Sequence, residues 1–403
     1  MDQAQTSPRR WGEFRQGWRY LLGAFLGIAG GFSSLFFYSQ GVFLKPLAAT
    51  FGWSRGEASL GAVAISVANA IALPITGRIA NSVGAARVGL FAGLWLSLGF
   101  VLMARFTTGL ASFLVLTFLL TVLSAGSTQL TFNTIIVKHF RRSRGLALGL
   151  AMFGTGVGAS LVPPALAVLV AEHGWRAGYY ALALVAAPMV LLAAPLLRGR
   201  SGEGRVTPVA MSWLTVALHP AMRTIGAIIL LAAVAIVGTT MHIVPLLTDR
   251  GMSPVMEGSF AAALGVAVIL GRVFTGMLLD RFDAGIVTAT LLLLGAGGLC
   301  LLAVDSVPLS TVGLLLVGLG MGTEADLLAF LLGRHFRQDS FATAYGMIYG
   351  VHAAGVGIGG LLAGLLFDLT GDYTVWLLLA AAAALAAALV ALATERGSRE
   401  LVE

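Results

Sequence analysis

The chain has 403 residues, of which 58% are hydrophobic and only 11% are charged. Soluble globular domains carry roughly 45–50% apolar and about 25% charged residues, so this composition excludes a water-facing surface over most of the molecule. The net charge of +7 would be compatible with nucleic-acid binding, but the positions of the basic residues, described below, argue against it.

The first residues, Met1 to Trp18, are polar, and no short apolar core with a small-residue cleavage site follows them, so no signal peptide is predicted. Apolar runs of about twenty residues, the length that crosses a bilayer as a helix, then recur along the chain. They predict twelve transmembrane helices near residues 18–44, 57–79, 86–104, 110–137, 145–170, 176–197, 223–248, 257–279, 285–303, 308–333, 342–367 and 373–394.

One long polar stretch, Arg198 to Ser212, separates the first six apolar runs from the last six. We therefore predict an all-α integral membrane protein with two pseudo-symmetric six-helix bundles, over residues 1–197 and 223–403. Residues 198–222 would form a cytoplasmic linker between them. The single cysteine, Cys300, excludes a disulfide framework. No metal-ligand spacing or catalytic set is apparent, so neither a cofactor nor an enzymatic activity is predicted.

The basic residues indicate how the spans are oriented. Of 25 Lys and Arg residues, 19 fall on the predicted side of the N-terminus and only five on the other side, namely Lys45, Arg55, Arg105, Arg176 and Arg250. The remaining one, Arg272, falls inside a span. Because cytoplasmic loops are enriched in basic residues, we expect both termini in the cytoplasm and a multi-pass protein of the inner membrane. Contact with anionic lipid then accounts for the positive charge, without nucleic acid.

The two halves resemble one another in sequence. The tetrad Lys138-His139-Phe140-Arg141 ends the fourth span, and Arg334-His335-Phe336-Arg337 ends the tenth, 196 residues later. At an offset of 197, three glycines match three others, which are Gly149, Gly158 and Gly174 with Gly346, Gly355 and Gly371. Chance matching among 52 glycines is the alternative. Repeated halves that bind substrate between them are a transporter architecture.

The segment Gly77-Arg78-Ile79-Ala80-Asn81 resembles the signature loop after the second helix of the major facilitator superfamily. This resemblance implies gating roles for Arg78 and, in the second half, for Asp280 and Arg334. Asn81 stands where the signature has Asp, which puts one gating ion pair of the first half in doubt.

Three further segments resemble the monocarboxylate porters and the oxalate–formate antiporters of that superfamily. They are Tyr38 to Leu47, Phe140 to Gly149, and Gly271-Arg272 with Gly276. The resemblance implies transport of small carboxylates, often with a proton. It also implies that Lys45, near the outer mouth, attracts the anion or takes part in proton entry, although a solvated helix-end lysine would need no such role. Val268 stands where mammalian members carry an Asp one turn before the arginine.

Arg272 is the strongest candidate for substrate binding. A central Arg costs at least about 3 kcal/mol on insertion scales. The guanidinium stays charged, so it needs an acidic partner or an anionic ligand, and its planar fork fits a carboxylate in bidentate geometry. The alternative is a buried ion pair that only locks helices together.

Two acids of the tenth span, Glu324 and Asp326, are candidates for proton coupling. They point about 200° apart around the helix, so only one of them can face Arg272. A carboxylate beside Arg has a lowered pKa, and a substrate that displaces it would raise that pKa and favour proton uptake. A purely structural polar pair is the alternative.

Further cavity residues are expected from both halves. Tyr349 and His352 share a helical face with Tyr345, although an interhelical hydrogen bond explains His352 equally well. His242 is expected to be structural. In the first half, Tyr38 and Asn69 are candidates for substrate contact, and the fourth span is made polar by Ser127, Thr128, Gln129 and Asn133. Each of these alone is more often an interhelical hydrogen bond than a ligand contact.

Together these features predict a monomeric secondary transporter of a small organic anion, such as lactate or pyruvate, in symport with protons. The alternatives within this class are anion exchange and drug efflux, and Arg272 argues against cationic drugs. A membrane sensor without turnover is the alternative from another class. An enzyme is least compatible with the residues.

Overall fold

The computed structural model describes residues 10–140, 143–197, 213–279, 281–336 and 338–400, and it leaves out some side chains inside helices, among them those of 323–330 and 333–335. Within these ranges every regular element is helical. The first half contains α1 (Arg10–Ala29), α2 (Phe32–Leu35), a 3-10 turn (Phe37–Ser39), α3 (Gln40–Phe51), α4 (Arg55–Val83), α5 (Ala85–Phe106), α6 (Leu110–Ser124), a second 3-10 turn (Ala125–Ser127), α7 (Gln129–His139) and α8 (Arg144–Leu197).

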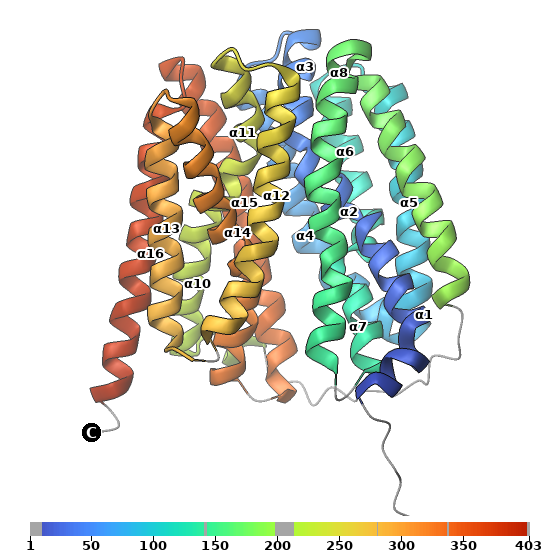
Figure 1. The fold of residues 1–403 in the computed structure, drawn as a ribbon, viewed down its shortest axis with the longest axis vertical. Helices are drawn as coiled ribbons and strands as arrows, with labels where there is room; N and C mark the ends of the chain where they lie inside the picture. The colour runs from blue at the N-terminus through green and yellow to red at the C-terminus, as the bar shows by residue number, and fades with distance from the viewer. Residues whose placement is uncertain (1–9, 141–142, 198–212, 280, 337, 401–403) are drawn as a thin grey trace, which may run out of the picture.

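The second half contains α9 (Trp213–Ala217), α10 (Pro220–Ala232), a π-helical turn (Ala233–Val237), α11 (Gly238–Asp249), α12 (Pro254–Leu279), α13 (Ala284–Ala303), α14 (Val307–His335), α15 (Gln338–Thr370) and α16 (Thr374–Glu400). Figure 1 shows α1 beginning and α16 ending at the same end of the bundle. We call this the terminal end. The opposite end, which carries the turns at Gly52, Gly174, Gly251 and Gly371, is the distal end.

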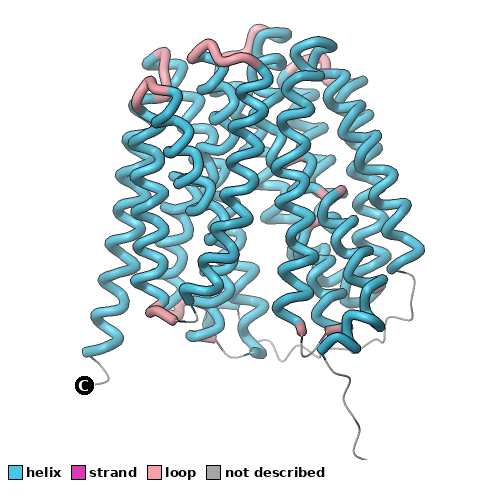
Figure 2. The backbone as a smooth tube through the Cα atoms, viewed as in Figure 1, coloured by secondary structure: helices cyan, strands magenta, loops and turns pink. Residues whose placement is uncertain are grey.

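The described residues provide twelve spans, as the apolar runs predict. Ten segments are long and apolar enough to cross a membrane, and Val307–Gly322 is a shorter one. One of the ten, Leu146–Leu197, turns back at Gly174 and so holds two spans. Figure 2 shows the loops gathered at the two ends of the bundle, apart from short breaks in its middle. The chain is therefore a multi-pass, all-helical membrane protein.

Three spans are interrupted midway, which the sequence did not indicate. The first breaks at Gly30 and Gly31, the fourth at its 3-10 turn, and the seventh at its π-helical turn. The backbone N–H of Phe32 donates to Ser127 Oγ (3.2 Å), so the first two breaks bond to each other. Irregular backbone at membrane depth is tolerated where protein buries it or where it lines a cavity. All three interrupted spans contribute residues to one cavity.

The internal repeat has matching local geometry in both halves. Gly174 and Gly371, paired by the sequence offset, both reverse the chain at positive φ, 80° and 82°. Phe140 and Phe336 both end a helix in extended conformation, and both are buried. Because the same turn and the same buried cap recur, chance matching of glycines no longer explains the repeat.

Some expected boundaries were wrong. The segment Gly77 to Val83, expected to be a loop, continues α4, and the chain turns only at Gly84, where φ is 102°. The first helix begins at Arg10 and not near residue 18, because the polar residues that precede the apolar run are helical as well. Part of the expected linker, α9, packs its fully buried Val216 against the second half.

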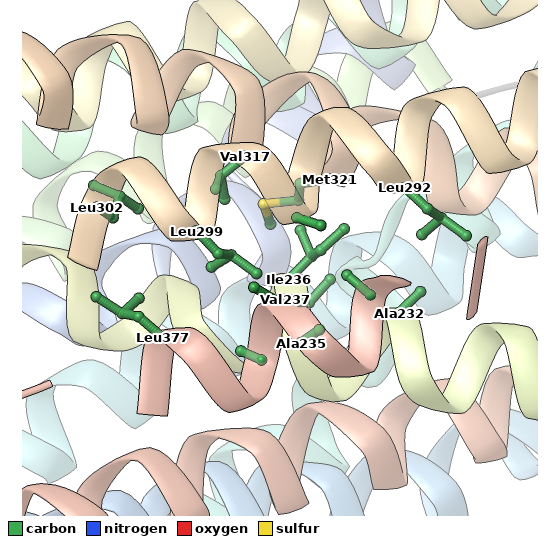
Figure 3. Close-up of a cluster of buried hydrophobic side chains, with 14 of the residues drawn as sticks. Ala232, Ala235, Ile236, Val237, Leu292, Leu299, Leu302, Val317, Met321 and Leu377 are labelled. Atoms are coloured by element: carbon green, nitrogen blue, oxygen red, sulfur yellow. The ribbon is translucent and has the colours of Figure 1, made fainter. Parts of the chain in front are cut away.

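Each half has a hydrophobic core of its own. In the first half, the two largest clusters of buried side chains lie within residues 24–197, and in the second half the largest cluster lies within residues 228–391. Figure 3 shows part of the latter, where Ile236 and Val237 of the π-helical turn pack against Leu299 of α13 and Val317 and Met321 of α14. Separate cores allow each half to move as a unit.

Candidate functional site

A cavity of about 120 Å³ lies between the two halves and takes its walls from both. The three interrupted spans all contribute to its lining. Its polar side chains are Ser33, Tyr38, Ser66, Asn69, Thr128, Gln129 and Thr155 from the first half and Arg272, Tyr345, Tyr349 and His352 from the second. The five residues predicted to contact substrate, Arg272, Tyr38, Asn69, Tyr349 and His352, therefore surround one cavity. Their role in binding stays a prediction.

Arg272 brings a positive charge to this cavity from α12. Its Nε is buried and has no hydrogen-bond partner among the described residues. One turn earlier, Val268 is buried and apolar, so α12 itself offers no acid there. An unpaired guanidinium nitrogen away from water is costly, because the nitrogen loses hydration without compensation. The site is therefore suited to a ligand that accepts hydrogen bonds and carries negative charge.

Close packing of α12 against α14 explains how Arg272 is held. A Cβ at Gly271 would overlap the carbonyl oxygen of Leu319, and a Cβ at Gly322 would overlap that of Val268. Small residues let the two backbones touch, which is how membrane helices associate without a hydrophobic driving force. The helix beside Arg272 is therefore the one that carries Glu324 and Asp326.

Helix α15 contributes a row of three rings to the cavity wall. The rings of Tyr345 and Tyr349 are stacked with centroids 6.3 Å apart, and Tyr349 lies 5.6 Å from the imidazole of His352. Their spacing of four and three residues puts them on one face of the helix, as the sequence predicts. In the first half, Tyr38 lies edge-on to Phe37, with ring centroids 5.5 Å apart.

The first half lines the cavity with neutral polar groups. The Thr155 hydroxyl donates to Gln129 Oε1 (3.4 Å), and the Ser66 hydroxyl donates to the carbonyl of Ala62 (2.9 Å). Thr155 was not predicted to be a site residue, because a lone threonine in an apolar helix does not indicate a binding site. Asn133, by contrast, is not among the lining residues, and its amide donates to the sulfur of Met152 (3.4 Å).

Lys45 does not line the cavity and instead joins the two halves at the distal end. Its Nζ lies 2.7 Å from Asp249 Oδ1, and the Arg55 guanidinium lies 3.1 Å from the same oxygen. Lys45 and Arg55 belong to α3 and α4, whereas Asp249 ends α11. One carboxylate of the second half thus holds two cations of the first. Whether Lys45 also attracts the anion or takes part in proton entry stays a prediction.

A second acid, Asp368 of α15, caps a helix of the other half. Its Oδ1 accepts from the backbone N–H of Arg55 (2.8 Å) and its Oδ2 from that of Gly56 (2.7 Å). The first N–H groups of a helix have no partner within it, and an acid there also complements the helix dipole. The N-terminus of α4 is therefore completed by a residue 312 positions away.

His242 lies beneath these acids and is almost fully buried, at 1% exposure. Its Nε2 lies 2.8 Å from the carbonyl oxygen of Gly360, and its Nδ1 lies 3.1 Å from the hydroxyl of Tyr373. A carbonyl only accepts, so Nε2 is the donor, and Nδ1 is left to accept from Tyr373. Ser59 of the first half lies 3.4 Å from Nε2. These contacts agree with the structural role expected of His242.

The halves meet near the distal end and separate toward the terminal end. A Cβ built at Gly364 would touch the backbone of Arg55, and one at Gly265 would touch Ser160. At the terminal ends of the same helices, a Cβ at Gly77, Gly149 or Gly346 would have nothing within 4 Å. Among the described residues, then, contacts between the halves close the distal end and leave the terminal end spread.

Several predicted site residues cannot be located by their side chains. Asp280 lies outside the described residues. Glu324, Asp326 and Arg334 belong to α14, but their side chains lie outside the described part. Arg78 is exposed near the terminal end of α4. Their coupling and gating roles stay predictions.

Comparison with known proteins agrees with this architecture. The model of the Major Facilitator Superfamily matches residues 26–349. Monocarboxylate transporter 11 of Homo sapiens is 30% identical over 94% of this chain and 83% of its own length. Monocarboxylate transporter 13 of Bos taurus is 28% identical over 92% of this chain and 87% of its own.

The crystal structure of the nucleoside transporter NupG covers 93% of this chain and 98% of its own at 14% identity, with a TM-score of 0.74. At that identity the likeness shows the fold alone. The family match and the related monocarboxylate transporters describe a membrane transporter and not an enzyme. The chain belongs to the major facilitator superfamily and resembles its monocarboxylate porters.

Proposed function

We propose that this transporter moves a small organic anion, a monocarboxylate, across the cytoplasmic membrane by alternating access, with the carboxylate bound at Arg272. The observation that carries the proposal is the Nε of Arg272, which is buried beside a cavity between the two halves and has no hydrogen-bond partner among the described side chains. A carboxylate supplies both the charge and the paired acceptors that a guanidinium prefers.

The proposed direction of opening follows from the contacts at the two ends. The 19 basic residues on the side of the termini favour a cytoplasmic terminal end. With the distal end closed by Asp249 and Asp368, the cavity would then face the cytoplasm in this structure. Rocking of the two halves would break the distal contacts and expose Arg272 to the other side. The proposed functional unit is a monomer, because the cavity is built within one chain.

Proton symport is the proposed coupling. An acid of α14, Glu324 or Asp326, would exchange between Arg272 and a proton as the substrate arrives, which links anion binding to proton uptake. His352, on the cavity wall, is a second candidate for taking up the proton. Anion exchange is the alternative, and transport assays separate the two, since an exchanger needs anion on the opposite side.

The test is uptake of labelled carboxylates into liposomes that contain the purified protein. Arg272→Lys should lower uptake at least about tenfold, because an ammonium keeps the charge but loses the planar fork. Arg105→Lys, at an exposed arginine of the distal end, is the matched control and should transport normally. Uptake by Arg272→Lys equal to that of the control would refute the role of Arg272.

A further inference from the structure

The size and lining of the cavity point to a narrower class of substrate. Besides its polar groups, the cavity is bordered by aromatic rings of both halves, Phe37 and Tyr38 on one side and Tyr345 and Tyr349 on the other. Ile65, Val237 and Val356 add aliphatic surface. These side chains give the wall a large apolar surface, beside the cation of Arg272.

The volume of about 120 Å³ is near that of an apolar cavity of about 150 Å³ that holds benzene in another protein. An acid of two or three carbons would leave much of the aromatic wall in contact with water. A six-membered ring would cover that wall, and burial of its surface is the favourable step.

The wall is also shaped for a flat body. Tyr345 and Tyr349 lie nearly parallel, with an interplanar angle of 20°, and Tyr349 is tilted by 32° to His352. Aromatic pairs favour offset-stacked and edge-to-face arrangements at centroid distances of about 4.5–7 Å. The first half adds Phe37 and Tyr38 to the same lining, with a mutual angle of 88°. Faces and edges are thus both offered to a ring between them.

We propose that the transported anion is an aromatic monocarboxylate, or one with an apolar body of the same size, whose carboxylate binds Arg272 while the ring lies between Tyr38 and Tyr349. This inference rests on the proposed function, because it assigns the carboxylate to Arg272. It adds the chemical nature of the rest of the molecule.

The test compares two acids that differ only by a ring, pyruvate and phenylpyruvate. Their Kd values are measured on the purified full-length protein by calorimetry, with phenylacetone as a ring compound that lacks the carboxylate. We expect phenylpyruvate to bind at least about tenfold more tightly than pyruvate, and phenylacetone to bind much more weakly than phenylpyruvate. Equal or tighter binding of pyruvate overturns the inference and leaves the proposed function intact. Binding by neither acid overturns both.

Two sets of variants locate the ring. Val356 lines the cavity on α15, so Val356→Phe should fill the space and remove the preference for phenylpyruvate over pyruvate. Ile358→Phe, at a side chain 47% exposed on the same helix, is the control and should keep the preference. An unchanged preference in Val356→Phe contradicts the proposed position.

If Val356→Phe fails to fold, variants of Tyr349 test the position of the ring instead. Tyr349→Phe keeps the ring and should keep the preference, whereas Tyr349→Ala should lose it. Equal preferences in these two variants would show that the ring does not rest on Tyr349.

Discussion

Asp249→Asn is the change most informative about alternating access. It removes the charge that holds Lys45 at 2.7 Å and Arg55 at 3.1 Å across the two halves. The Asp249 side chain is 29% exposed, and its partners are 31% and 12% exposed, so solvent screens the pairs only in part. Exposed pairs contribute about 0.2–1 kcal/mol each and loss of one partner from a buried pair costs about 3–5 kcal/mol, so a loss of roughly 1–2 kcal/mol is expected.

That loss falls only on the conformation in which the distal end is closed, because the two cations and the acid separate when it opens. A shift of about 1–2 kcal/mol changes the ratio of closed to open molecules roughly five- to thirtyfold. Spin labels at Thr108 and Val307, exposed positions near the distal end of each half, report this ratio in distance distributions. In Asp249→Asn, the fraction of molecules with the longer distance between the two labels should increase.

Asp305→Asn is the matched control. Asp305 pairs with Arg250 at 3.4 Å within the second half and is 86% exposed, so its loss should leave the distances unchanged. If Asp249→Asn leaves the distribution unchanged, or if Asp305→Asn shifts it equally, the reasoning about the distal end is refuted.

Three further outcomes are expected. Gly174→Ala places a side chain at φ 80° and should lower the unfolding temperature through a cost of about 1–2 kcal/mol. Gly149→Ala, with open space at its Cβ, should not lower it, and equal unfolding temperatures of the two variants would contradict the strained turn. Asn69→Leu should weaken carboxylate binding in calorimetry, whereas Asn133→Leu should not, because only Asn69 lines the cavity; the reverse order would contradict the assigned lining. An inward proton gradient should raise carboxylate uptake into liposomes several-fold, and uptake indifferent to the gradient would rule out symport.

Hydropathy was sufficient for most of the fold, since burial in lipid is a property of each segment by itself. Twenty apolar residues have few other options than a helix across the bilayer, so the spans follow from length and composition. The helix breaks were not predicted because they depend on partners elsewhere. The break at Gly31 is stabilised where Phe32 meets Ser127, 95 residues away, and no local pattern marks that contact.

The cavity residues also divide into those that a local sequence pattern indicates and those that depend on tertiary contacts. Arg272 was identified from sequence because a charge within an apolar run is conspicuous and costly. The α15 residues Tyr345, Tyr349 and His352 were grouped correctly because helical spacing alone puts them on one face. Thr155 was missed, since its contact with Gln129 exists only when the fifth span packs against the fourth.

By itself, then, the sequence determined the spans, the six-plus-six repeat and the cation in the membrane, because each depends on local composition or spacing. Only the tertiary structure decided which charges meet. No role was predicted from the sequence for Asp249 and Asp368, yet they hold Lys45, Arg55 and the start of α4 across the two halves. Such pairing depends on distances between helices far apart in the chain, and packing alone sets those distances.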